Sequence, residues 1–313
     1  MRVLLFFAAV CASAQIRVRP GESIQQAIDS AAAGSTISID AGTYREVISI
    51  SKPGITLRGA GKSPGDVEIV FNRSAGDSDG TFNSATANIR GDDFRAENLT
   101  IANDFNATHP QLSQGSQALA ISVTGDRAIF RRVRLLGNQD TVYLGTKSCK
   151  PGSGDSCAAA RQYFENCYIE GNVDFIFGEG KAVFENCEIH STEHKGGYIT
   201  AQGKHYAAQD SGFVFRRCRL TAEPGVSGVW LGRPWRPFAT VVLIETRIGP
   251  HVEPAGWREW HPGETHYLDT VYYAEFRSSG SMDKRDPHTH ILTSAEAARF
   301  ETKAFLNWDP KHD

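Results

Sequence analysis

Long hydrophobic runs, an excess of positive charge and low-complexity linkers are all missing from this sequence of 313 residues. The apolar stretch at residues 3–10 is shorter than the roughly 20 residues that a membrane-spanning helix needs, and no other segment looks transmembrane. A formal net charge of −3 gives no basic surface for nucleic acid, although a local cleft can still be positive and bind a polyanion. We therefore expect one domain, with no membrane anchor and no nucleic-acid partner.

The N-terminal residues have the pattern of a secretory signal peptide. Arg2 supplies the positive charge, residues 3–10 the apolar region, and residues 12–14 (ASA) the small-residue cleavage pattern. We expect residues 1–14 to be removed and residues 15–313 to form the mature domain, exported to the extracellular space or the periplasm. The alternative for the apolar stretch is a buried first strand.

Five segments begin with phenylalanine and carry leucine or isoleucine five residues later, starting at Phe94, Phe130, Phe164, Phe184 and Phe215. Each segment alternates like a short strand, and spacings of 36, 34, 20 and 31 residues indicate stacked structural repeats. The irregular spacing favours an all-β parallel β-helix, because insertions in such a solenoid become external loops.

Both ends of this solenoid carry patterns typical of helices. Apolar residues recur at helical spacing within residues 21–33, which predicts a short N-terminal capping helix. Residues 294–300 (SAEAARF) predict a C-terminal helical segment with Ser294 as its cap.

Cysteine is scarce: one of the six would leave with the signal peptide, and five remain. Because five is odd, at least one thiol stays free or pairs between chains. Cys149 and Cys157 bracket a loop rich in Gly, Ser and Pro, and a disulfide could close it. The repeat places Cys167, Cys187 and Cys218 at one position of three coils. Cys167 and Cys187 could therefore form a disulfide or, equally, remain buried thiols.

Two aspartates share one position of the repeat. Asp140 follows Phe130 by ten residues, and Asp174 follows Phe164 by the same ten. Since neighbouring parallel strands are about 4.7–4.9 Å apart, both carboxylates should lie close together on one outer face. Such a pair raises the pKa of one member, which allows an acid and a base to coexist near neutral pH. The alternative is that both aspartates cap turns.

Several motifs surround these aspartates in a characteristic order: GTYRE at residues 42–46, QALA at 117–120, QDTVY at 139–143, GNVDFIFG at 171–178 and LGRPW at 231–235. In this order and spacing the sequence resembles the pectin methylesterase family over nearly the whole mature chain. The resemblance implies a right-handed parallel β-helix. It also implies a carboxylic ester hydrolase that converts methyl-esterified homogalacturonan (pectin) to pectate and methanol, without metal or cofactor.

The resemblance also implies a role for each matching residue. Asp174 matches the nucleophile, and Asp140 matches the general acid that later acts as the base. Gln117 and Gln139 match the amides that stabilise the oxyanion, and Arg233 matches the arginine that orients Asp174. Covalent catalysis by a carboxylate needs this set of an acid, a nucleophile and uncharged N–H donors.

Aromatic residues near the motifs match positions of the substrate cleft, where their rings pack on the apolar faces of sugars. These are Tyr143, Phe177, Trp235, Trp257 and, on a weaker local match, Phe82. For any one of them the alternative is packing in the core.

Two other kinds of function remain alternatives. A polygalacturonase or pectate lyase could use the same solenoid, because glycosidases also employ paired carboxylates and lyases use calcium-binding ones. A non-catalytic carbohydrate-binding protein is a second alternative, since a fold does not imply an activity. The histidines show no metal-ligand spacing. We expect a monomer.

Overall fold

The computed structural model describes residues 15–109, 111, 116–147, 160–192, 196–280 and 284–313. The expected signal peptide and the cysteine pair Cys149 and Cys157 lie outside the described residues.

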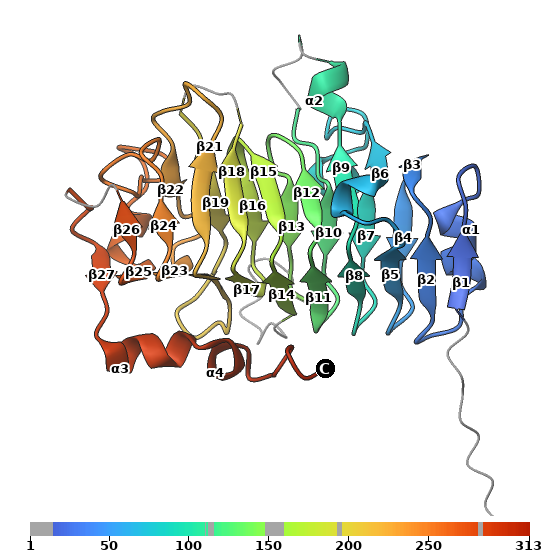
Figure 1. The fold of residues 1–313 in the computed structure, drawn as a ribbon. Helices are drawn as coiled ribbons and strands as arrows, with labels where there is room; N and C mark the ends of the chain where they lie inside the picture. Colours follow the sequence, from blue (N-terminus) through green and yellow to red (C-terminus); the bar gives the residue numbers. More distant parts are fainter. Residues whose placement is uncertain (1–14, 110, 112–115, 148–159, 193–195, 281–283) are drawn as a thin grey trace, which may run out of the picture.

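Three parallel sheets run along the molecule, and most coils of the chain contribute one strand to each sheet in turn, although, among the described residues, the coils at the two ends have no strand in sheet C (Figure 1). Sheet A contains, in spatial order, β1 (Gln15–Val18), β2 (Thr36–Ile39), β5 (Thr56–Gly59), β8 (Arg95–Glu97), β11 (Ala128–Arg131), β14 (Arg161–Glu165), β17 (Lys181–Glu185), β20 (Gly212–Arg216), β23 (Thr240–Ile244), β25 (Tyr272–Phe276) and β27 (Thr289–Ile291). Sheet B contains β3 (Gly42–Arg45), β6 (Val67–Phe71), β9 (Thr100–Asn103), β12 (Arg134–Leu136), β15 (Tyr168–Gly171), β18 (Glu188–Ser191), β21 (Arg219–Ala222), β24 (Arg247–Ile248) and β26 (Ser279–Gly280). Sheet C contains β4 (Ile48–Ile50), β7 (Ala87–Ile89), β10 (Ile121–Val123), β13 (Val142–Leu144), β16 (Val173–Gly178), β19 (Tyr198–Gln202) and β22 (Trp230–Gly232).

The phenylalanine repeat sets the register of sheet A in four of its five members. Phe130 pairs with Phe164, Phe164 with Phe184, and Phe184 with Phe215, and their rings stack at 4.6, 4.7 and 4.6 Å. Phe94 is out of register, because the ladder pairs Ala96 with Phe130. The ring centroids of Phe94 and Phe130 are still 5.8 Å apart. Phe94 therefore packs in the same core, although it precedes the residue paired with Phe130 by two positions.

The turn from sheet A to sheet B explains this register. In seven coils one non-glycine residue there adopts a left-handed conformation: Asn98, Arg132, Asn166, Asn186, Arg217, Glu245 and Arg277. A single residue of positive φ reverses the chain sharply, and asparagine tolerates it better than most. The residue after it is buried in each coil from Leu99 to Thr246. The turn, rather than the first aromatic residue, therefore fixes which residues align.

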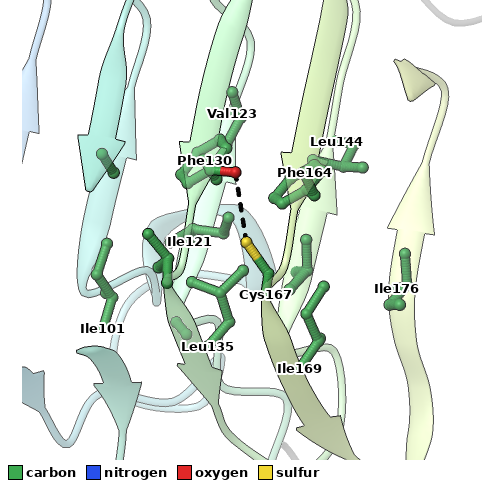
Figure 2. Close-up of a cluster of buried hydrophobic side chains, with 14 of the residues drawn as sticks. Ile101, Ile121, Val123, Phe130, Leu135, Leu144, Phe164, Cys167, Ile169 and Ile176 are labelled. Carbon is green, nitrogen blue, oxygen red and sulfur yellow. Dashed lines mark hydrogen bonds between the residues drawn. The ribbon is translucent and has the colours of Figure 1, made fainter. Parts of the chain in front are cut away.

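The three described cysteines follow these turns, and of the two alternatives for Cys167 and Cys187 the structure has the buried thiols and not the disulfide. Cys167, Cys187 and Cys218 are free and buried. Each thiol donates to a carbonyl of the preceding coil; the Sγ of Cys167 lies 3.4 Å from the oxygen of Phe130 (Figure 2). Equivalent side chains of stacked parallel coils point the same way, so each sulfur faces that carbonyl. Burial raises the pKa of the Cys187 thiol well above its usual value, so it stays neutral.

Helix α1 (Ile24–Ser30) covers the N-terminal end of the solenoid, as expected (Figure 1). It buries Ile24, Ala27 and Ile28, and Ser23 caps it. The carboxylate of Glu46 accepts hydrogen bonds from the backbone N–H groups of Ile24 at 2.7 Å and Gln25 at 3.1 Å. A carboxylate at a helix N-terminus satisfies free N–H groups and complements the helix dipole. Glu46, the last residue of the GTYRE motif, therefore stabilises the capping helix.

The C-terminal segment lies along the outer face of sheet A (Figure 1). It comprises α3 (Ser294–Ala297), η4 (Ala298–Phe300) and α4 (Thr302–Leu306). Thr293 rather than Ser294 caps α3, because its hydroxyl accepts from the N–H of Glu296 at 3.3 Å. Phe300 and Leu306 pack with Tyr163 of the sheet. The remaining short helices are η1 (Pro64–Asp66), η2 (Thr81–Asn83), α2 (Phe105–Thr108) and η3 (Tyr267–Asp269).

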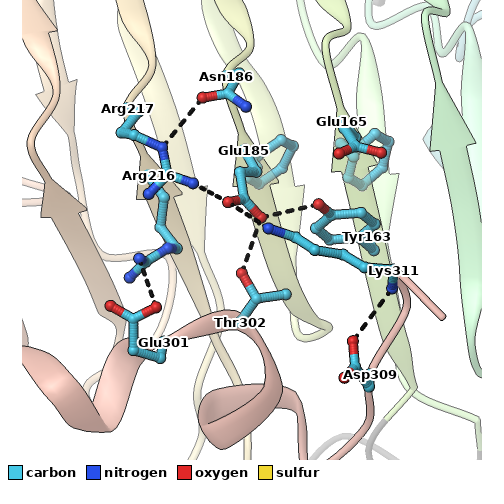
Figure 3. A network of polar contacts seen from close by, with 12 residues as sticks. Tyr163, Glu165, Glu185, Asn186, Arg216, Arg217, Glu301, Thr302, Asp309 and Lys311 are labelled. Carbon is cyan, nitrogen blue, oxygen red and sulfur yellow. Dashed lines mark hydrogen bonds and ion pairs between the residues drawn. The ribbon is translucent and has the colours of Figure 1, made fainter.

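A buried carboxylate anchors this segment to the sheet (Figure 3). Glu185 of β17 accepts hydrogen bonds from Tyr163 at 2.8 Å, Thr302 at 3.0 Å and Lys311 at 2.8 Å, and it contacts Arg217. Burial alone would raise the pKa of Glu185, but the bonds from Lys311 and Tyr163 outweigh it and hold this pKa below its usual value.

Candidate active site

Asp140 and Asp174 lie side by side at the outer face of sheet C, as their shared offset predicted. The ladder pairs Val142 with Ile176 and Tyr143 with Phe177, so the two aspartates occupy equivalent positions two residues earlier. The N–H of Asp140 donates to the carbonyl of Val173 at 3.0 Å, which continues the pairing toward the aspartates. Both aspartates line one cleft of about 390 Å³.

The backbone is unusual at both aspartates. Asp140 has φ 63° and Asp174 has φ 50°, in the left-handed region that non-glycine residues rarely adopt. The pairing of β16 with β19 also shifts register between Val173 and Ile176, around Asp174. Strained conformations of this kind cluster at functional sites, and bulges redirect side chains there.

Arg233 forms a bidentate hydrogen-bonded ion pair with the Asp174 carboxylate. Its Nε lies 3.0 Å from Oδ1 and its second guanidinium nitrogen 2.6 Å from Oδ2. The guanidinium itself lies 4.1 Å from the ring of Tyr198 and 4.2 Å from that of Trp260. A planar guanidinium suits both a bidentate carboxylate contact and stacking on aromatic rings. Arg233 is therefore fixed on every side, and it fixes Asp174.

The two carboxylates have different electrostatic surroundings. Burial, followed by the negative charge of Asp174, raises the pKa of Asp140 well above its usual value, and the more distant Arg233 offsets this only in part. Burial also raises the pKa of Asp174, which is 5% exposed, but the hydrogen bonds and charge of Arg233 oppose that rise. Asp140 is therefore the member that keeps its proton, and Asp174 is the member that ionises first.

Two side-chain amides complete the polar part of the cleft. Gln117 and Gln139 both line it beside the aspartates. The carbonyl oxygen of the Gln139 amide accepts from the hydroxyl of Ser116 at 3.4 Å, which leaves its NH₂ group for another acceptor. The backbone N–H of Ala118 donates to the carbonyl of Gln139 at 3.1 Å, so the two glutamine segments are tied together.

A row of aromatic rings runs beside the cleft. Phe82, Phe177 and Trp235 line it, whereas Tyr143, expected there from the sequence, is not among its lining residues and donates its hydroxyl to Glu179 at 3.1 Å. Phe82 lies 4.8 Å from Tyr143, Tyr143 lies 5.1 Å from Phe177, and Phe177 lies 5.9 Å from Trp235. Phe82 is 49% exposed, which is unusual for so large an apolar side chain. An open aromatic row of this kind suits the apolar face of a sugar.

Trp257 is not part of this row, contrary to the sequence-based expectation. It is 2% exposed and stacks on Tyr273 with ring centroids 4.0 Å apart. A bridge between Gly232 and Trp257 turns it into the core. Trp260, three residues later, lines the cleft and covers Arg233 instead. The sequence signal for this placement is the second tryptophan of residues 254–260 (PAGWREW), whereas the family resemblance was based on the first tryptophan only.

Among the described residues no cluster of three or more His, Cys, Asp or Glu could hold a metal ion. No described helix is long and apolar enough to cross a membrane.

The fold and the site together define a β-helical hydrolase whose cleft contains a paired carboxylate, two amides and aromatic rings. The pectinesterase family model matches residues 11–309. Pectinesterase 31 of Arabidopsis thaliana is 34% identical over 307 residues, covering 93% of this chain and 89% of the relative. The chain belongs to the pectinesterase family.

Solved structures agree with this membership. The pectin methylesterase from carrot matches with a TM-score of 0.81 and 29% identity, covering 93% of this chain and 92% of that one. A pectin methylesterase in complex with hexasaccharide VII matches with a TM-score of 0.77 and 29% identity over 92% and 94% of the two chains. The expected right-handed β-helix and the expected activity, hydrolysis of a carboxylic methyl ester, are thereby confirmed.

Proposed function

We propose that this cleft removes methyl esters from polygalacturonate by covalent catalysis, with Asp174 as the nucleophile and Asp140 as the acid and base. One observation carries the assignment. Arg233 binds both oxygens of Asp174 and does not bind Asp140, so two adjacent carboxylates differ in the proton that they hold. The ionised member can attack, and the protonated member can donate.

In the first half of the reaction, an oxygen of Asp174 attacks the ester carbonyl carbon. The carbonyl oxygen becomes an oxyanion, and the side-chain N–H groups of Gln117 and Gln139 stabilise it without introducing a competing charge. The tetrahedral intermediate then expels methoxide, which takes the proton of Asp140 and leaves as methanol. An acyl anhydride with Asp174 remains, and Asp140 is now ionised.

In the second half, ionised Asp140 takes a proton from water, and the resulting hydroxide attacks the anhydride carbonyl. Collapse of this intermediate releases the galacturonate carboxyl group and restores the carboxylate of Asp174. Arg233 favours that leaving carboxylate through its two hydrogen bonds. Asp140 regains its proton, so the cycle consumes one water and one ester.

The aromatic residues of the cleft would position the substrate by packing against its sugar rings. A related pectin methylesterase has been solved with a hexasaccharide, and an oligosaccharide of that kind would lay its sugar rings along Phe82, Phe177 and Trp235, with Tyr143 supporting Phe82 and Phe177. Trp260 contributes a further ring to the cleft, next to Arg233. We further propose that residues 15–313 act as an exported, monomeric catalytic domain after removal of residues 1–14.

Methanol release from highly methylated pectin tests the proposal, with the wild type and Asp174→Asn measured in parallel. We expect methanol from the wild type alone, with neither new reducing ends nor unsaturated ends. Reducing ends would indicate a glycosidase, and unsaturated ends a lyase. Methanol at near wild-type rate from folded Asp174→Asn protein would contradict the nucleophile.

A further inference from the structure

A second cavity, of about 490 Å³, lies outside the cleft, between the loop at residues 203–211 and helix α4. Its walls include Lys181, Lys204, Gln209, Phe238 and Phe305. Pockets of this size hold small ligands in many proteins. None of these residues takes part in the ester hydrolysis described above.

The charge of this cavity is positive, although the whole chain is mildly acidic with a net charge of −3. Lys181, Lys204 and Arg299 line it, against one carboxylate, Asp210. Lys181 pairs with Asp210 at 2.5 Å. Within the described part of the chain neither Lys204 nor Arg299 forms an ion pair, although the charges of Asp210 and Glu296 act on them, so the residues that line the cavity carry a net positive charge. A concave positive surface raises the local concentration of anions.

One buried donor in the cavity lacks a hydrogen-bond partner among the described residues, and a charged donor beside it is half-buried. Lys204 is half-buried, and this burial lowers the pKa of its ammonium group. Gln209 accepts from the N–H of His205 at 2.7 Å through its amide oxygen, but its buried amide nitrogen has no hydrogen-bond partner among the described residues. A bound anion would accept a hydrogen bond from the Gln209 amide and offset the burial of the Lys204 ammonium, because a buried polar group is unfavourable without a partner.

Apolar rings stand next to these donors. Phe238, Tyr272 and Phe305 line the cavity, and the Nζ of Lys181 lies 5.0 Å from the ring of Phe305. Cationic donors beside aromatic rings suit a ligand with a carboxylate and an apolar face. A uronic acid residue has both, and every ester that the enzyme cleaves creates one more carboxylate on the polymer.

The cavity is close to the cleft. Trp235 lines the cleft and Phe238 lines the second cavity, three residues further along the chain. Three residues span at most about 10 Å. The N–H of Trp235 donates to Gln202 at 3.1 Å and that of Phe238 to Lys204 at 3.0 Å, so one pair of bonded segments separates the two sites. A single polymer chain could therefore occupy both, and the second contact would act at high effective concentration.

We propose that the cavity around Lys204 and Arg299 is an exosite for acidic sugar residues of the de-esterified polymer, which holds the polymer while the cleft acts on neighbouring esters. The proposal rests on the proposed function, since it takes the product of that reaction as the ligand.

Calorimetric binding of unesterified trigalacturonate tests the exosite without any turnover, because this ligand has no ester. Each lost charge-assisted hydrogen bond should weaken binding about tenfold or more, so we expect this loss in Lys204→Gln and in Arg299→Gln. Lys303→Gln is the matched control, since Lys303 is an exposed lysine of α4, four residues after Arg299, and does not line the cavity. Thermal unfolding verifies the fold, and the exposed Arg299 gives a variant that should fold even if the half-buried Lys204 variant does not.

Kinetics then separate this site from the cleft. With a methylated trimer, too short to reach both sites, both variants should keep the wild-type kcat and KM. With partly de-esterified pectin, KM should rise about tenfold at constant kcat. Unchanged trigalacturonate binding in both variants would overturn the exosite, even if methanol release proceeds as proposed. Displacement of trigalacturonate by equal concentrations of inorganic phosphate would also overturn it, by showing a cavity that accepts any anion.

Discussion

Asp174 and Glu185 are both buried carboxylates near the outer surface of the solenoid, 5% and 1% exposed, yet their surroundings differ. Glu185, on sheet A, contacts four donors, among them Lys311 and Tyr163, and its pKa is lowered despite burial. Asp174, on sheet C, has Arg233 as its one charged partner among the described residues, and burial still raises its pKa. The fully bonded carboxylate anchors the structure, whereas the partly bonded one keeps lone pairs for chemistry.

The largest expected effect separates these two residues directly. Asp174→Asn should lower kcat by about 10⁴-fold or more, because the nucleophile is lost while its shape is kept. Glu185→Gln should leave kcat near the wild-type value and lower stability instead. Methanol-release assays and chemical denaturation of both proteins test this contrast, and equal loss of activity in both would contradict it.

The second carboxylate of the cleft should show a smaller loss. Asp140→Asn removes the group that protonates methoxide and later activates water, and loss of a general acid and base costs about 10²–10⁴-fold in kcat. Steady-state kinetics give the value. A change confined to KM would instead place Asp140 in substrate binding.

The dependence of kcat/KM on pH tests the different protonation of Asp140 and Asp174. Activity requires ionised Asp174 and protonated Asp140, so kcat/KM should fall at low pH as Asp174 gains a proton. It should also fall at high pH, as Asp140 loses the proton that its raised pKa retains. Because the pair is coupled, both limbs report macroscopic pKa values of the pair. An alkaline limb that persists unchanged in Asp140→Asn would contradict the assignment.

The Glu185 anchor should affect stability rather than chemistry. Lys311→Met removes a donor to a buried carboxylate and should lower the free energy of unfolding by about 1–3 kcal/mol near pH 7. The folded pKa of Glu185 is lowered, so its contribution is present above the unfolded pKa and is lost as pH falls through the folded pKa. Urea denaturation at neutral and acidic pH measures both effects, with Lys303→Met as the control. An undiminished difference between wild type and Lys311→Met at acidic pH would contradict the linkage.

The two neighbouring tryptophans provide the smallest effect. Trp260→Phe should raise KM by a few fold, since Trp260 covers Arg233 at the cleft, whereas Trp257→Phe should lower stability by about 0.5–3 kcal/mol with KM unchanged. Steady-state kinetics give KM and thermal unfolding gives the stability of both variants. The reverse pattern would restore the original sequence-based assignment of Trp257.

Much of the fold could be predicted, because a solenoid repeats the same local contacts. The positions of Phe130 and Phe164 fixed the offset that brings Asp140 and Asp174 together. Phe94 shows the limit of that reasoning, since the motif matched by letters but the left-handed turn at Asn98 sets the register. The stacked cysteines show another, because the sequence left a disulfide and buried thiols equally open, and the structure shows each thiol donating to a backbone carbonyl.

The sequence by itself determined the repeat, the stacked carboxylate pair and, through its ordered motifs, the family and the reaction. Tertiary structure alone decided that Trp260 rather than Trp257 faces the cleft, and that the C-terminal segment closes over Glu185. The physical reason is that strand periodicity fixes positions within a coil, whereas contacts between loops depend on how the chain returns between coils.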